Sequence, residues 1–251
     1  MSVVHVGCAG FSVPRRKYLS KLSFVEIELR TPAPNAKVLT AWREQTGAGF
    51  GWSVVAPRSL WGEADWPLRD ERYTQSEFDK LAHVCSVLQP QALVLRTPRA
   101  LSPGSVACRR FLALLPRLRA LVPVVAWEPT GLWERTDARV LVAAEGVVVV
   151  CDPLHDDLVD EASAYVRLRG LGGDRRYHRG KLEDLATVLG AVEQGFVVFD
   201  TDNGFSEAVQ LRALLAGQEP AADDESDDDA ESELDEYDRD DDDEDDDDDS
   251  R

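Results

Sequence analysis

Eight short apolar runs recur between residues 3 and 199, and polar or charged residues follow each run. The runs are rich in β-branched and aromatic residues, as is typical of parallel strands that are buried on both faces. Most are separated by enough residues for one crossover helix, which parallel strands require. They occupy residues 3–8, 24–29, 51–55, 92–95, 123–127, 146–151, 164–168 and 196–199. This pattern predicts an α/β fold, a single TIM-type (β/α)8 barrel, with its functional site at the carboxyl ends of the strands.

The residues between the runs show the apolar spacing of helices in several places. We expect helices at 36–46, 77–88, 106–121, 181–189 and 206–215. The connection 59–72 is long for a compact domain and contains Trp61 and Trp66. Two interpretations of it remain open, a lid over the mouth of the barrel and a surface segment that wraps around the two tryptophans.

The net charge of −19 is concentrated at one end of the chain. Residues 219–251 hold 22 acidic and two basic residues, whereas the other residues hold 25 acidic and 26 basic ones. Such a segment has too little apolar surface to fold, and its charges repel each other. We therefore expect a barrel over residues 1–218 and a disordered Asp/Glu-rich tail over residues 219–251. The tail is interpreted as a solubilising segment or as an arm that engages a basic protein partner, and it argues against direct nucleic-acid binding.

Localisation and thiol chemistry are predicted from absences in the sequence. No apolar run reaches the roughly 18 residues of a membrane helix, and the N-terminus enters a strand without the features of a signal peptide. We expect a cytoplasmic protein with no membrane partner. The four cysteines lie far apart, so we expect buried, reduced thiols and no structural zinc site.

Charged side chains near the strand ends are the candidate site residues. Strand alternation places Glu26 and Glu28 on one face of their run, and Arg167 and Arg169 on one face of theirs. Carboxylates inside a barrel are costly unless they are paired or hydrogen-bonded. The further candidates lie at or beyond the ends of other runs, namely Arg58, Arg96, Glu128, Asp152, Tyr177, Asp202 and Asn203. Tyr177 follows the Gly-rich segment 170–173, which lies where many barrels bind phosphate groups.

The leading hypothesis is an enzyme that acts on a small anionic or sugar-like substrate. In this hypothesis Glu26, Glu128 and Asp152 are the catalytic carboxylates, because burial can raise a carboxyl pKa into the range of a general acid or base. The substrate-binding residues are Glu28, Arg58, Arg96, Arg167, Arg169, Tyr177, Asp202 and Asn203. The arginines would hold an anion by fork-shaped hydrogen bonding.

Three alternatives remain open. The same charges could form a purely structural network of ion pairs. The barrel could bind a small ligand, or regulate a partner, without catalysis. A metal-dependent enzyme ranks third, with Glu26, Glu128, Asp152 and Asp202 around a hard cation. Because the sequence contains no P-loop, Rossmann fingerprint or nucleophile elbow, we expect no cofactor.

Several short motifs occur together in one order, and with them the chain resembles the DUF72 (YecE-like) family as a divergent member. The motifs are VGCAGF at 6–11, VEI at 25–27, APR at 56–58, WEP at 127–129, VCDP at 150–153, YVRL at 165–168 and Tyr177. The resemblance covers roughly residues 3–215 and implies a TIM-type barrel. It implies no reaction, because the activity of the family is not established.

The chain also departs from the family pattern at several positions. It has Phe11 in place of Trp, Val55 in place of Lys, Thr130 in place of Arg and Arg169 in place of His. It has Arg96 near a position that is often Gln, and Asp202-Asn203 in place of an Asn pair. The absence of a Lys and a His from strand ends removes two proton-transfer groups, which favours a ligand-binding or inactive relative.

Overall fold

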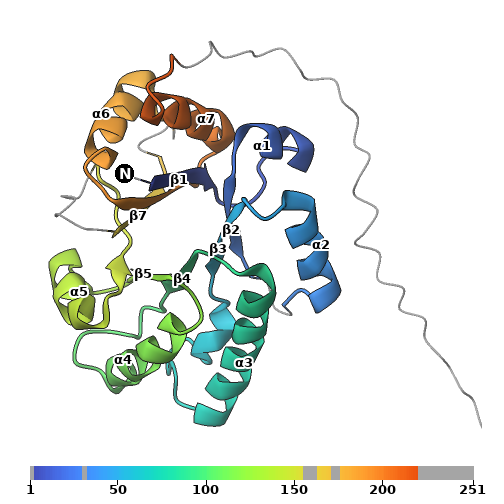
Figure 1. The fold of residues 1–251 in the computed structure, drawn as a ribbon. Coiled ribbons are helices and arrows are strands. Elements are labelled where there is room, and N and C mark those ends of the chain that lie inside the picture. Colours follow the sequence, from blue (N-terminus) through green and yellow to red (C-terminus); the bar gives the residue numbers. More distant parts are fainter. Residues whose placement is uncertain (1–2, 30–32, 155–162, 171–175, 220–251) are drawn as a thin grey trace, which may run out of the picture. The chain divides into compact units, whose positions relative to one another are not determined.

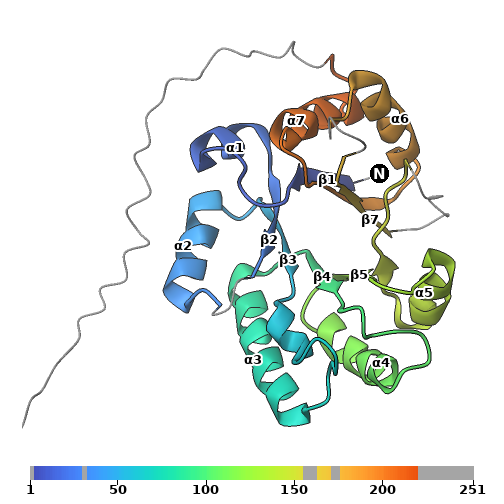
Figure 2. The same ribbon diagram turned by 180° about the vertical axis from the view of Figure 1, so that it is seen from behind.

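A computed structural model describes residues 3–29, 33–154, 163–170 and 176–219 of the chain. Within these residues eight strands lie at the centre and helices surround them (Figures 1 and 2). The strands are β1 (Val3–Cys8), β2 (Phe24–Glu28), β3 (Gly51–Val55), β4 (Ala92–Arg96), β5 (Val124–Glu128), β6 (Val148–Val149), β7 (Ser163–Leu168) and β8 (Gln194–Phe199). The α-helices are α1 (Arg15–Lys21), α2 (Ala36–Thr46), α3 (Glu71–Leu88), α4 (Val106–Arg119), α5 (Arg135–Val142), α6 (Arg179–Leu189) and α7 (Gly204–Leu215). Two short 3₁₀ helices, η1 (Arg58–Trp61) and η2 (Ala143–Glu145), follow β3 and α5.

All paired strands are parallel, in the orders β1-β8-β7 and β2-β3-β4-β5-β6. Isolated bridges join the two groups, between Ala9 and Glu26 at one seam and between Cys151 and Val166 at the other. The backbone N–H of Gly10 donates to the Glu26 carbonyl at 2.7 Å, and that of Cys151 donates to the Tyr165 carbonyl at 3.0 Å. The barrel predicted from the eight apolar runs is confirmed.

The predicted strands and helices match the structure closely in most places. The greatest difference among the strands is β6, which was expected over 146–151 and has regular pairing only at Val148–Val149. The residues after β6 still bond to both neighbouring strands. The N–H of Val150 donates to the Trp127 carbonyl in β5 at 2.8 Å, and that of Cys151 donates to the Tyr165 carbonyl in β7 at 3.0 Å. Between β6 and β7 the described residues contain no helix, and residues 155–162 lie outside them.

Helices α4, α6 and α7 differ from the prediction by two residues at one end, and three other helices differ more. Helix α3 begins at Glu71, six residues before the predicted start, because the Asp70 side chain caps it by accepting from the N–H groups of Arg72 and Tyr73. Its first turn is polar and lacks the apolar spacing on which the prediction relied. Helices α1 and α5 were not predicted, since both are short and rich in charged residues.

Two sets of apolar side chains result from the strand alternation. Phe24, Tyr165 and Phe196 point into the barrel with valines and alanines of the neighbouring strands, and the rings of Phe24 and Phe196 both contact His5. The alternate residues of the strands pack against the surrounding helices. The interior is therefore filled by side chains.

Other expectations concern cysteines, membranes and the tail. All four cysteines are free and buried, and burial raises the pKa of Cys8 to about 11. No helix in the described part of the chain is long and apolar enough to cross a membrane. The predicted acidic tail lies outside the described residues except for Glu219, so its disorder remains a prediction.

The seam between β1 and β2 depends on Gly7. A Cβ at this position would lie 2.1 Å from the Phe24 carbonyl oxygen. Tyr18 bridges the same seam, because its hydroxyl accepts from the Cys8 N–H at 2.9 Å and donates to the Phe24 carbonyl at 2.8 Å. The two strands are thus held too close for any side chain at Gly7.

We predict that Gly7→Ala lowers the free energy of unfolding by about 1–3 kcal/mol or more, because backbone must move to relieve the contact. The matched control is Gly180→Ala in α6, where an added Cβ would meet no atom within 4 Å. That control is expected to be neutral or to stabilise by up to about 1 kcal/mol. Urea unfolding measures both changes, and equal effects of the two substitutions would contradict this account of the seam.

Candidate functional site

The inward-facing residues at the carboxyl ends of the strands form a connected group of charges. Alternation along β2 and β7 turns Glu26, Glu28 and Arg167 toward the interior, as the sequence predicted. The structure brings together seven of the predicted site residues, namely Glu26, Glu28, Arg58, Arg96, Glu128, Arg167 and Arg169. Asp200, which follows β8, completes this set. We call these eight residues the mouth network.

Arg167 lies at the centre of the mouth network and is only 3% exposed. Its Nη2 donates to Glu26 Oε1, and its Nη1 lies 3.4 Å from Asp200 Oδ2. Its Nε lies 3.5 Å from Glu128 Oε2. A single guanidinium therefore connects the carboxylates of Glu26 in β2, Glu128 in β5 and Asp200 after β8, which satisfies the rule that a buried charge needs partners.

On the side of Glu26 that faces the barrel interior, a tyrosine hydroxyl contacts its carboxylate, and a serine hydroxyl contacts that tyrosine. The hydroxyl of Tyr165 donates to Glu26 Oε2 at 2.5 Å and lies 2.8 Å from the hydroxyl of Ser53. All three side chains are buried inside the barrel. Glu26 is consequently enclosed by Tyr165 and Arg167, and it has no direct access to solvent.

The upper part of the mouth network is more exposed to solvent than Arg167 and Glu26. Arg169 donates to Glu128 Oε1, and its Nε lies 3.6 Å from Asp200. Arg96 donates to Glu128 at 3.1 Å and lies 3.5 Å from Glu28. The side chain of Arg169 is 52% exposed and that of Arg96 is 26% exposed.

Arg58 is the outermost cation, with its side chain 85% exposed and its Nε 3.9 Å from Glu28. The Glu28 side chain is itself 50% exposed. Exposed pairs at such distances contribute little to stability. Arg58, Arg169 and Glu28 are therefore the members of the mouth network that an incoming ligand can contact at low cost.

The pKa values of the two most enclosed glutamates of the mouth network are shifted in opposite directions. Burial raises the pKa of Glu26, although Arg167 and the Tyr165 hydroxyl oppose the shift. Burial also acts against ionisation of Glu128, but Arg167, Arg169 and Arg96 outweigh it and lower the pKa of Glu128. Glu128 therefore ionises more readily than an ordinary glutamate, and Glu26 less readily.

The other predicted site residues lie outside the mouth network. Tyr177 is buried, its hydroxyl accepts from the Gly170 N–H at 3.0 Å, and burial raises its pKa to about 12 with a smaller contribution from the charge of Asp152. Asp152 accepts from the Leu154 N–H at 3.1 Å. Asp202 is exposed, and Asn203 is the N-cap residue of α7. Of the Gly-rich phosphate loop 170–173, only Gly170 belongs to the described residues.

Sequence reasoning overlooked Asp200, Tyr165 and Ser53. Asp200 could have been found from alternation, because it continues the inward-facing series of Phe196 and Val198 in β8. Tyr165 shares the face of Arg167 for the same reason. Ser53 carries no comparable signal, since a single serine in a buried strand is compatible with many roles.

Another polar contact in this region is structural. Glu207, at the start of α7, is 4% exposed and accepts from the Tyr177 N–H at 2.7 Å and from the Thr201 hydroxyl at 2.6 Å. It thereby ties the segment before α6 to the end of β8 and satisfies buried donors on both.

The described residues contain no group of three His, Cys, Asp or Glu side chains that could hold a metal ion. The four carboxylates considered for a cation, Glu26, Glu128, Asp152 and Asp202, are not gathered in one place. Arginines occupy the space between Glu26 and Glu128 instead. The arrangement of this part of the chain therefore fits anion recognition and hydrogen bonding better than binding of a hard cation.

Comparisons with known proteins agree on the fold. No protein-family model and no curated protein sequence matches the chain. Among solved structures, a DUF72 family protein from Enterococcus faecalis has a TM-score of 0.62 at 12% identity, covering 86% of this chain and 94% of that chain. An AP endonuclease of family 2 from Brucella melitensis has a TM-score of 0.58 at 15% identity, covering 85% and 98%.

A xylose isomerase domain-containing protein from Salmonella typhimurium is a further similar structure. Its TM-score is 0.56 at 15% identity, and 85% of this chain and 97% of that chain are covered. Likeness at such low identity shows a shared fold, and the TIM-type barrel is the fold that the DUF72 resemblance implied. The resemblance found in the sequence motifs and the similarity of the structures thus agree.

We predict that Arg167→Ala lowers the free energy of unfolding by about 3–5 kcal/mol, because it leaves Glu26 buried without its charged partner. The control is Arg169→Ala, which removes a half-exposed arginine of the same network and is expected to cost no more than about 1 kcal/mol. Thermal or urea unfolding measures both. A similar small loss in the two variants would show that Arg167 is not the structural centre.

We also predict opposite pH effects for the two enclosed glutamates. Because the folded pKa of Glu26 is raised, its contribution to stability is fully present below the ordinary value of 4.5 and is lost as the pH rises through the folded pKa. Because the folded pKa of Glu128 is lowered, its contribution is present above 4.5 and is lost as the pH falls.

Urea unfolding over a range of pH tests this difference. Relative to the unmodified protein, Glu26→Gln should become less destabilising as the pH rises, whereas Glu128→Gln should become less destabilising as the pH falls. Parallel curves for the two variants would contradict the opposite shifts.

Proposed function

We propose that this chain is a divergent DUF72-type barrel and an enzyme that binds a small anionic or sugar-like substrate at the carboxyl-terminal mouth of the barrel. Arg169 and Arg58 contact the substrate through charge-assisted hydrogen bonds. Glu128 and Glu28 accept hydrogen bonds from substrate hydroxyl groups. Arg167 holds these groups in place from beneath without touching the substrate.

The gradient of exposure along the mouth network carries this proposal. Arg167 is enclosed, whereas the side chains of Arg169 and Arg58 are 52% and 85% exposed. Arg58 is loosely paired, with Glu28 at 3.9 Å, while Arg169 donates to Glu128 and lies 3.6 Å from Asp200. A rigid buried base with an exposed rim is the arrangement in which a ligand can add to or replace a rim contact without unfolding its support. The position at the carboxyl ends of the strands is where barrels of this type carry their sites.

Proton transfer at this site would use two carboxyl groups with different tendencies to ionise. Glu128 remains ionised and orients a substrate hydroxyl, while Glu26 retains a proton more readily. A proton from Glu26 would reach a substrate at the mouth only through movement of Arg167, because Tyr165 lies beneath Glu26 and leads to the buried Ser53. Asp152 lies outside this pair and has no role in the proposal.

A thermal-shift screen of the full chain against sugar phosphates, sugar acids and neutral sugars tests the proposal. A ligand at about 100 times its dissociation constant should stabilise the protein by roughly 2.7 kcal/mol. Arg169→Ala should weaken binding of the hit about tenfold or more, since a hydrogen bond to a charged group contributes about 1.5–3 kcal/mol.

Arg179→Ala is the matched control, because Arg179 is 59% exposed and pairs with Glu183 on α6, away from the mouth network. It should leave binding unchanged. If no compound of these classes shifts the unfolding temperature, or if Arg179→Ala weakens binding as much as Arg169→Ala, the proposed site is wrong.

One observation favours a second candidate, a barrel that binds its ligand without catalysis. Every carboxylate of the mouth network has an arginine within 4 Å, so each carboxyl group is already committed to an ion pair. In this alternative the acidic tail engages a basic protein partner and the barrel senses the ligand. Conversion of the screened ligand by the unmodified protein, measured by mass spectrometry, distinguishes the enzyme from the binding module.

A further inference from the structure

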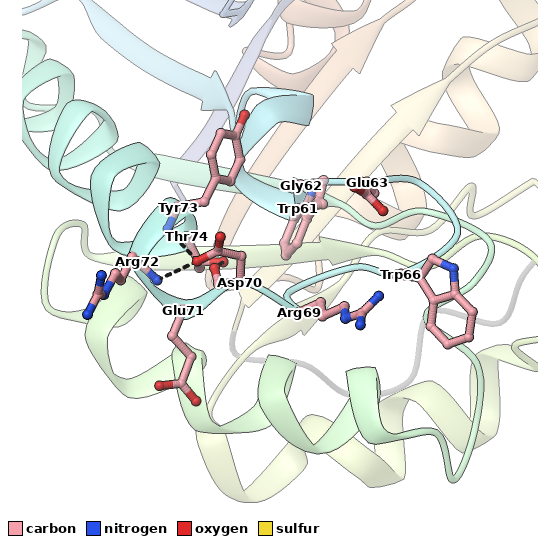
Figure 3. Close-up of a pocket in the computed structure, with 10 residues that line it drawn as sticks. All are labelled: Trp61, Gly62, Glu63, Trp66, Arg69, Asp70, Glu71, Arg72, Tyr73 and Thr74. Carbon is pink, nitrogen blue, oxygen red and sulfur yellow. Dashed lines mark hydrogen bonds between the residues drawn. The ribbon is translucent and has the colours of Figure 1, made fainter.

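A second pocket lies apart from the mouth network, in the connection between β3 and α3 (Figure 3). It has a volume of about 980 Å³ and is lined by residues of one continuous segment, Trp61–Gly62–Glu63, Trp66, Arg69, Asp70, Glu71, Arg72, Tyr73 and Thr74. The segment was expected to be a lid or a wrap around two tryptophans. Trp61 is buried in the core, as a wrap requires, whereas Trp66 is 63% exposed.

The backbone that carries Trp66 is held in a defined shape. The N–H of Leu68 donates to the Trp61 carbonyl at 2.8 Å and closes a loop, within which the N–H of Trp66 donates to the Glu63 carbonyl at 3.1 Å. Leu68 is buried and has a φ of +59°, a conformation that costs energy for a residue other than glycine. A strained and hydrogen-bonded loop therefore presents a large aromatic ring to solvent, which points to a role in binding.

The pocket combines aromatic rings with groups that can bond to hydroxyls. Tyr73 is 44% exposed, and Figure 3 shows it on the opposite side of the lining residues from Trp66, with Arg69 nearer to Trp66. The guanidinium of Arg69 lies 5.8 Å from the centroid of the Trp66 ring. Asp70 uses one carboxylate oxygen, Oδ1, for the N–H groups of Arg72 and Tyr73.

Buried Trp61 adds an unsatisfied donor to this lining. Within the described part of the chain its Nε1 is buried and has no hydrogen-bond partner. Buried donors of this kind normally find an acceptor. Because Nε1 is enclosed, the proposed ligand does not need to contact it, and the proposal does not depend on this donor.

We propose that this pocket binds a neutral sugar, whose apolar ring face stacks on Trp66 and whose hydroxyls bond to Asp70 and Arg69. The charges of the lining argue against two other classes of ligand, a nucleic acid and an apolar protein surface. Three acidic and two basic side chains line the pocket, so it lacks the positive field that a nucleic acid needs. The same five charges are unfavourable at the core of an apolar protein interface.

This site is separate from the mouth network, and it does not depend on the proposed function. Its ligand contacts a rigid loop at the start of α3, whereas the ligand of the mouth contacts side chains at the ends of the strands. Either site can therefore be absent without affecting the other.

The test is binding of the full chain to the disaccharides maltose, cellobiose and chitobiose, measured by isothermal titration calorimetry. We expect at least one to bind, and Trp66→Ala to weaken that binding by at least about fivefold because the stacking surface is lost. Trp66→Phe should retain part of the affinity. The unfolding temperature should not change, since Trp66 is exposed.

Leu132→Ala is the control, because Leu132 is 81% exposed and lies outside the pocket. It should leave disaccharide binding unchanged. The proposal is overturned if none of the three disaccharides binds or if Trp66→Ala binds as well as the unmodified protein. A single-stranded oligonucleotide that binds through Trp66 in place of the sugars would also overturn it.

Discussion

The ion pairs of Arg167 are the interaction on which this structure depends most. One guanidinium in the barrel interior connects carboxylates of β2 and β5 and the carboxylate that follows β8. Buried charges of this kind are stable only when several partners compensate the loss of water. The geometry of Glu26, Glu128 and Asp200 is therefore coupled, and any group that binds above them meets a preorganised surface.

Within the mouth network, the buried side chains hold the exposed ones in place, and only the exposed ones can contact a ligand. The lower part, with Tyr165 and Ser53, is enclosed and neutral apart from the Glu26–Arg167 pair. The upper part is exposed to solvent at Arg169 and Arg58, of which Arg58 is loosely paired. An interior filled with aromatic and aliphatic side chains blocks access from the other end of the barrel, so a ligand of this network enters at the carboxyl ends of the strands.

The pocket in the connection between β3 and α3 is built differently from the mouth network. Its side chains come from one local segment, and backbone hydrogen bonds rather than ion pairs fix their positions. The short helix η1 links the two regions, since it begins at Arg58 in the mouth network and ends at Trp61 in the pocket. Arg58 of the mouth network and Trp61 of the pocket therefore lie three residues apart in one connection.

The sequence by itself determined the strands, the inward direction of Glu26, Glu28, Arg167 and Arg169, and the barrel, because these follow from local alternation and from burial of parallel strands. Tertiary structure decided which charges meet. Asp200 joined Arg167 while Asp202 and Asp152 did not, since strand stagger and loop geometry set distances that no local pattern contains. It also decided that Trp61 is buried and Trp66 exposed, because long-range packing places one ring in the core and hydrogen bonds of the loop turn the other to solvent.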